Sequence, residues 1–216
     1  MDEPKLAGTR TAEETTGFDV ADLAPTWHEQ LAGWLAAAES AGLAEPNAMV
    51  LATAGEDGRP SSRTVLCKGL DARGVVFYSN YTSAKSRDLR TSRYASVTFP
   101  WYPMRRQAHV CGSVERVTPA ETRVYWESRP RGSQLGAWAS AQSAIVRDRR
   151  VLDDALAAAD RRFAGAPVPV PLHWGGWRIV PDRVEFWQGR ADRMHDRLRF
   201  EIDRADRTWA VHRLAP

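Results

Sequence analysis

The feature that most constrains the fold is a succession of short runs rich in β-branched and aliphatic residues, separated by turn signals. The first two runs are joined by Gly55-Glu-Asp-Gly58, which is typical of a β-hairpin. The sequence lacks both an internal repeat and the regular strand-helix alternation of a parallel sheet. We therefore predict a mainly β (α+β) protein, an antiparallel barrel with peripheral helices. The predicted strands cover residues 48–54, 61–68, 74–80, 95–101, 105–117, 176–180, 183–188, 197–202 and 208–214.

Four helices are expected between these strands. Apolar residues recur at helical spacing over 26–41 and 147–164, and Ser83 can cap a short helix over 83–94. Thr118-Pro-Ala-Glu121 has the form of a capping box with proline at the first helical position. The helix that follows places Tyr125 and Arg129 four residues apart, before Pro130 ends it.

Length and charge favour one ordinary globular domain. Residues 1–22 are polar and predict a flexible N-terminal arm, and 23–216 form a single domain. The net charge of +3 is spread along the chain, which argues against nucleic acid. Cys67 and Cys111 lack metal-site spacing, so we expect buried free thiols and no metal. Without a signal peptide or a long apolar run, the sequence predicts a soluble cytoplasmic protein.

The segment 185–197 gathers planar and cationic side chains in a strand-like pattern: Trp187, Arg193, His195 and Arg197. Arginine can bind phosphate or stack on a conjugated ring, and histidine can exchange a proton near neutral pH. The set suits a flat, anionic ligand. An exposed hairpin with solvated charges explains this segment equally well when it is taken alone.

Three further segments favour phosphate. Arg63 and Lys68 lie on opposite faces of one predicted strand, so that strand can contact two ligands or two parts of one. Lys85 lies in the first turn of a predicted helix, where backbone amides attract anions, although Ser83 can be a simple cap. Residues 128–134 place two arginines, a glycine and a serine in a turn that can surround an anion; a solvated basic turn is the alternative. Dinucleotide, P-loop, serine-hydrolase and zinc-peptidase motifs are absent from the sequence.

Taken together and in order, these segments resemble the pyridoxine/pyridoxamine 5'-phosphate oxidase family, from about residue 26 to the C-terminal Arg213-Leu-Ala-Pro216. The resemblance is carried by residues 63–68, 77–79, 99–101, 106–107, 128–134, 136–138, 142–143, 174–176, 185–197 and 213–216.

The resemblance implies an FMN-binding split β-barrel that works as a homodimer, with FMN in the cleft between subunits. Carried over by position, the residues implied to contact FMN are Arg63, Thr64, Val65, Leu66, Cys67, Lys68, Tyr78, Ser79, Lys85, Gln107, Gln142, Ser143, Trp187 and Arg197.

The implied substrates are pyridoxamine or pyridoxine 5'-phosphate, oxidised to pyridoxal 5'-phosphate with O2 as acceptor and release of H2O2, and of NH3 from the amine. The implied substrate-phosphate residues are Lys68, Tyr125, Arg129 and Ser133. Arg193, Met194 and His195 are implied to lie at the substrate ring, with Arg193 and His195 as the catalytic pair. This is the reaction that ends vitamin B6 cofactor synthesis or salvage.

Two departures from the family pattern stand out. Ala84 replaces an arginine that family members often carry at the flavin phosphate, and the N-terminal arm lacks an Arg-Arg-x-Tyr-like segment. Two alternatives to the oxidase stay open from sequence: a split-barrel flavin or deazaflavin reductase, and a non-catalytic flavin- or pyridoxal-phosphate-binding module.

Overall fold

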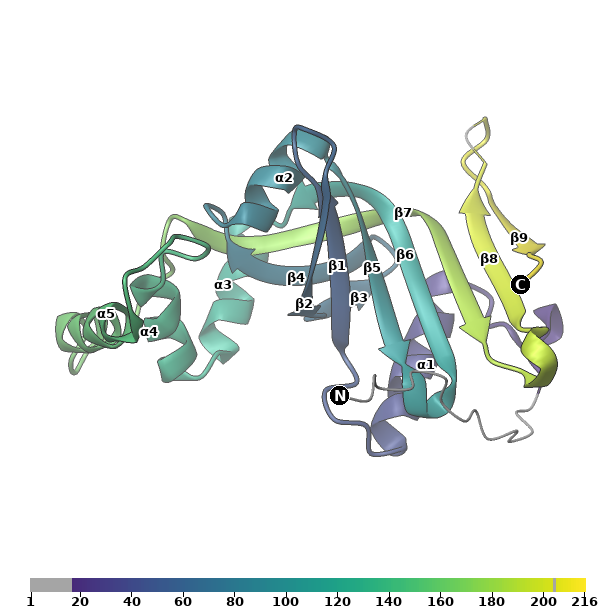
Figure 1. Cartoon of the computed structure of the whole chain (residues 1–216), viewed down its shortest axis with the longest axis horizontal. Helices are drawn as coiled ribbons and strands as arrows, with labels where there is room; N and C mark the ends of the chain where they lie inside the picture. The colour runs from purple at the N-terminus through teal and green to yellow at the C-terminus, as the bar shows by residue number, and fades with distance from the viewer. Residues whose placement is uncertain (1–16, 204) are drawn as a thin grey trace, which may run out of the picture.

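A computed structural model describes residues 17–203 and 205–216. Within them, nine strands form one antiparallel sheet in the order β2-β1-β5-β6-β7-β4-β3, with β8 paired to β7 and β9 to β8 (Figure 1). The predicted antiparallel, mainly β class is confirmed. The strands are β1 Ala48–Ala54, β2 Pro60–Leu66, β3 Gly69–Asp71, β4 Gly74–Asn80, β5 Tyr94–Trp101, β6 Arg106–Arg116, β7 Trp174–Gln188, β8 Asp196–Ile202 and β9 Trp209–Arg213.

The predicted helix caps form as the sequence indicates. Thr118 and Glu121 make the reciprocal capping box, and the Thr26 and Ser83 side chains each accept a backbone amide hydrogen bond. The helices are α1 Trp27–Ser40, α2 Ala84–Ser92, α3 Pro119–Ser128, α4 Arg131–Ala139 and α5 Arg149–Arg162, with short 3-10 turns η1 Val20–Asp22, η2 Tyr102–Met104 and η3 Ala191–Arg193. None of these helices is long and apolar enough to cross a membrane.

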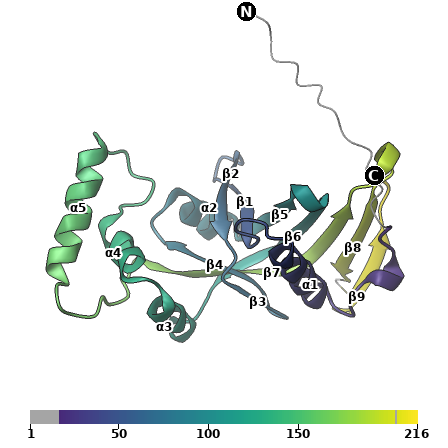
Figure 2. The same cartoon turned by 90° about the horizontal axis from the view of Figure 1, so that it is seen from below.

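Two hydrophobic clusters organise the molecule. The larger one fills the curled sheet beneath α1, where Trp34 packs edge-on against Phe186. The smaller one lies under α3, α4 and α5 and is centred on Trp126 and Trp174. Figure 2 shows α3–α5 gathered at one end of the molecule, and β8 and β9 at the other. Cys67 and Cys111 are buried free thiols, as predicted.

The sequence prediction was wrong at two places in the second half. Residues 176–180 and 183–188 belong to one long strand, β7, because Pro181 lies at a bulge opposite Gly112 and does not end the strand. A Cβ on Gly112 would lie 2.0 Å from the Val180 carbonyl oxygen, so only glycine permits this close approach. Pro130 does end α3, yet it also starts α4, which was not predicted.

The predicted arm of residues 1–22 lies mostly outside the described residues, since 1–16 are not among them. The remainder belongs to the folded structure. Phe18 is buried and its ring centroid lies 5.1 Å from that of Trp34. Asp19 caps η1.

Candidate active site

One cavity of about 290 Å³ gathers residues from β2, β4, α2, α3 and the segment after α4; we call it the central cavity. Every residue that lines it was named from the sequence as a flavin or substrate residue. The lining residues are Arg63, Thr64, Val65, Leu66, Lys68, Tyr78, Ser79, Lys85, Tyr125, Arg129 and Gln142.

Arg63 enters this cavity from β2 and is held by polar groups behind it. Its guanidinium donates to the hydroxyls of Thr53 and Ser61, and Asp88 lies 3.9 Å away. Thr53 in turn donates to Asp88 at 2.7 Å, which completes the network. Burial lowers the pKa of Arg63 despite Asp88. The guanidinium is therefore oriented, half-buried and suited to an incoming anion.

Lys85 lies in the first turn of α2, close to Arg63 of β2. Its Nζ donates to the Gln142 Oε1 at 2.8 Å and to the Ser79 hydroxyl at 3.2 Å, both neutral acceptors. Burial lowers the pKa of Lys85, and the nearby Arg63 charge lowers it further. Two mutually repelling cations at one end of a cavity favour a bound phosphate. Ser143 completes this end, since its hydroxyl accepts from the Ala84 amide at 3.2 Å.

The opposite side of the central cavity is aromatic and cationic. The rings of Tyr78 and Tyr125 stack with centroids 4.0 Å apart, and Tyr78 also stacks on Trp174. The Arg129 guanidinium lies 4.8 Å above the Trp174 ring and donates to the Ser133 carbonyl at 2.9 Å. The Arg129 Nε is buried and has no hydrogen-bond partner among the described residues. An unsatisfied cationic donor at this position suits an acidic ligand.

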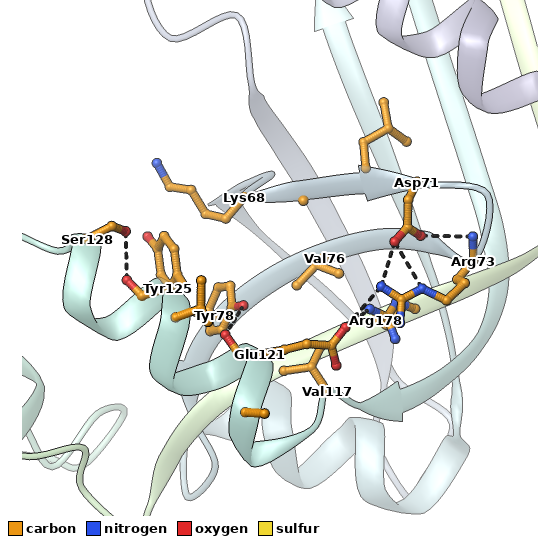
Figure 3. Close-up of a pocket in the computed structure, with 14 residues that line it drawn as sticks. Lys68, Asp71, Arg73, Val76, Tyr78, Val117, Glu121, Tyr125, Ser128 and Arg178 are labelled. Carbon is orange, nitrogen blue, oxygen red and sulfur yellow. Dashed lines mark hydrogen bonds and ion pairs between the residues drawn. The ribbon is translucent and has the colours of Figure 1, made fainter.

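A second, larger cavity of about 530 Å³ adjoins the first, and Lys68, Tyr78 and Tyr125 line both (Figure 3). Its far wall is an ion-pair network in which Glu121 accepts from Arg178 at 2.7 Å and lies 3.0 Å from Arg73. The Thr118 backbone amide, then the Arg178 guanidinium and to a lesser extent the Thr118 hydroxyl lower the pKa of Glu121 to about 2. The network ties α3, which carries Tyr125 and is capped by Arg129, to β7.

Cys67, predicted to contact FMN, is instead buried in the larger hydrophobic cluster and lines neither cavity. The other remaining predicted residues lie near and beyond the C-terminal end of β7, with Gln107 on the neighbouring β6. We call residues 187–197 with Gln107 the C-terminal half-site. Gln107, Trp187 and Arg197 are directly opposite one another on β6, β7 and β8, so they share a face of the sheet. The His195 ring lies 4.6 Å from that of Trp187. Arg197 Nε donates to Glu185 at 2.8 Å.

One strand separates these two regions. Trp174, at the start of β7, stacks with the central-cavity aromatics, whereas Trp187 lies thirteen residues further along. That distance is roughly 40 Å along an extended strand. Figures 1 and 2 both place α3 and the β7–β8 connection at opposite ends. One chain therefore does not bring Arg193, Met194 and His195 to Tyr125 and Arg129.

Comparison with known proteins decides the family. Residues 35–161 match the family model described as pyridoxamine 5'-phosphate oxidase, and residues 174–216 match the pyridoxine 5'-phosphate oxidase C-terminal dimerisation region. The chain belongs to the pyridoxine/pyridoxamine 5'-phosphate oxidase family. A relative of that name from Saccharopolyspora erythraea is 60% identical, over 98% of this chain and 95% of the relative. Another, from Synechocystis sp., is 49% identical over the full length of both.

Solved structures agree on the fold. PhzG from Burkholderia lata, determined with tetrahydrophenazine-1-carboxylic acid, superposes with a TM-score of 0.87 at 32% identity, covering 95% of this chain and all of that one. An FMN-binding protein from Nostoc punctiforme, related to pyridoxamine 5'-phosphate oxidase, has a TM-score of 0.72 at 17% identity, covering 90% of this chain and 99% of that one. The latter likeness shows the fold alone.

The structure also shows residues that hold the site residues in place and that the sequence analysis missed. Asp88 holds Arg63, and Arg178 holds Glu121 and through it α3. Ser61 and Arg63 alternate on one strand, which is a signal that they share a face. No local sequence pattern indicates that Asp88 lies beside Arg63 or that Arg178 lies beside Glu121, because the tertiary fold creates these contacts.

Proposed function

We propose that this protein is an FMN-dependent oxidase that converts pyridoxamine or pyridoxine 5'-phosphate to pyridoxal 5'-phosphate. For the amine, the balanced reaction consumes the substrate, water and O2, and releases pyridoxal 5'-phosphate, NH3 and H2O2. The observation that carries the proposal is the central cavity, where the residues implied for FMN and those implied for the substrate phosphate line one volume.

The residues present fit FMN. Arg63 and Lys85 are two half-buried cations at one end of the cavity, and the Lys85 Nζ donates to neutral oxygens of Ser79, Ser83 and Gln142. A phosphate monoester carries up to two negative charges and relieves that repulsion through charge-assisted hydrogen bonds. In this assignment Gln142 and Ser143 hold the same end, while residues 63–66 lie along the cofactor. Bound FMN supplies the hydride acceptor for the substrate C4' and the electrons that reduce O2 to H2O2.

The second phosphate, that of the substrate, is assigned to Lys68, Tyr125, Arg129 and Ser133. Arg129 carries the orphaned buried Nε, and Lys68 lines both cavities. Fixing the phosphate there orients the flat ring and holds the reacting carbon at a set distance from the acceptor. The protein contributes binding and orientation, with Arg193 over the ring and His195 at its substituent.

Because these last two residues lie far from the cavity in one chain, we assign them to a second copy. A homodimer in which the C-terminal half-site of one subunit faces the central cavity of its partner would complete two equal sites. The match of residues 174–216 to a dimerisation region supports this arrangement.

The test is aerobic turnover of pyridoxamine 5'-phosphate by the purified protein with added FMN, following pyridoxal phosphate and H2O2 together. We expect equal, FMN-dependent formation of both. Flavin binding with neither product would refute the oxidase and favour a reductase or a binding module.

A further inference from the structure

The Asp196 carboxylate joins three segments that are far apart in sequence. Its Oδ2 accepts from the Phe18 amide at 3.1 Å and from Arg190 at 3.2 Å, and its Oδ1 accepts from Arg213 at 2.9 Å. The Asp196 side chain is only 14% exposed, so these charge-assisted bonds are partly shielded from water. Arg213 also pairs with Asp19 at 2.8 Å.

The same junction reaches His195 through Arg190. While the Arg190 side chain binds Asp196, its backbone amide donates to His195 Nδ1 at 3.0 Å and its carbonyl accepts from Arg105 at 3.0 Å. A ring nitrogen that accepts a hydrogen bond carries no proton, so the neutral ring holds its proton on Nε2.

The backbone connection between Arg190 and His195 is strained. Arg193 has a φ of 62°, in the left-handed region that is unfavourable for any residue other than glycine. A strained residue persists where its surroundings hold it, and the Arg190–Asp196 and Arg190–His195 bonds enclose it on both sides.

We propose that Asp196 is a positioning residue for His195. Through Arg190 it fixes the His195 ring with Nε2 as the protonated nitrogen. Through Phe18 and Arg213 it couples the position of the ring to the N-terminal segment and the last strand. The inference rests on the proposed function, in which His195 contacts the substrate. It makes His195 a hydrogen-bond donor to the substrate, with no role as a base in its neutral form.

A double-mutant cycle with FMN-loaded protein tests this. Asp196→Asn should lower kcat/KM for pyridoxamine 5'-phosphate by on the order of tenfold, and should have almost no further effect in a His195→Gln background. Multiplicative effects of the two substitutions, or an unchanged kcat/KM in Asp196→Asn, would overturn the proposal. Asp206→Asn, at an exposed aspartate that likewise accepts a backbone amide, is the matched control and should leave kcat/KM unchanged.

Two further measurements keep the test decisive. If Asp196→Asn fails to fold, Arg190→Gln keeps the backbone amide, removes the charged link, and should show the same coupling to His195; independence would refute the link. ¹⁵N NMR of labelled histidine, assigned with His195→Gln, should show one Nε2-protonated tautomer in the parent and a mixture in the variant. An unchanged spectrum in the variant would refute the role of Asp196 even if the protein is an oxidase. A changed spectrum together with an inactive parent protein would support the role of Asp196 and refute the proposed oxidase function.

Discussion

The central cavity and the C-terminal half-site are built in opposite ways. The cavity is walled by strands and by α2 and α3, and the Arg178 side chain that braces α3 is only 5% exposed. The half-site includes a short connection in which Arg193 has a left-handed backbone. This connection is anchored through Asp196 by Arg190 and Arg213, whose side chains are each 43% exposed. In the proposed function, a preformed pocket for two phosphates thus contrasts with a tethered, strained segment that meets the substrate ring, so we expect binding and orientation to be separable.

The largest effect is expected at the tethered segment. Arg193→Ala should lower kcat/KM for pyridoxamine 5'-phosphate by about 100-fold while FMN stays bound, because misplacement of a reacting ring by about 1 Å has that scale of cost. Steady-state kinetics and flavin fluorescence measure the two quantities. An unchanged kcat/KM would refute the placement of Arg193 at the ring.

Arg129→Ala should act on the cavity and chiefly raise KM, by roughly 10- to 100-fold, because hydrogen bonds to charged groups contribute about 1.5–3 kcal/mol. kcat at saturation and the Kd for FMN should change little. Loss of FMN with normal substrate binding would show that the two phosphate sites are exchanged.

Mixing these two variants tests whether the regions meet across a dimer. If each site takes its cavity from one copy and its half-site from the other, a hybrid dimer has one site with both lesions and one intact site. After unfolding and co-refolding of equal amounts, half the dimers are hybrids, so activity should recover to roughly a quarter of the parent's. No recovery, with hybrids verified by differently tagged chains, would mean that both regions serve the same site within one chain.

The sequence predicted local structure well where the signal is local. The Thr118 capping box and the hairpin turn at residues 55–58 depend on side chains within a few positions. It failed at Pro181, because whether proline ends a strand or lies in a bulge depends on Gly112 in a different strand. Likewise, the residues lining the cavity were identified through resemblance. Asp88 and Arg178 support the cavity, and Asp196 holds the C-terminal half-site, through contacts that only the tertiary fold creates.

The smallest effect we predict concerns the brace of the cavity. Glu121 has a folded-state pKa of about 2, below its ordinary 4.5, so its ionised form favours the folded state. That contribution is fully present above about pH 4.5 and is lost as pH falls towards 2.

Glu121→Gln should therefore lower the free energy of unfolding at pH 7 by about 1–3 kcal/mol, and by progressively less in acid. Urea titrations at pH 7 and pH 3 measure the difference; an equal deficit at both would show that Glu121 acts through packing rather than charge. Arg73→Ala is the comparison variant: the Arg73 side chain is 61% exposed, so removing this partner of Glu121 should lower the free energy of unfolding less than Glu121→Gln does, and should leave the buried Arg178 pair intact.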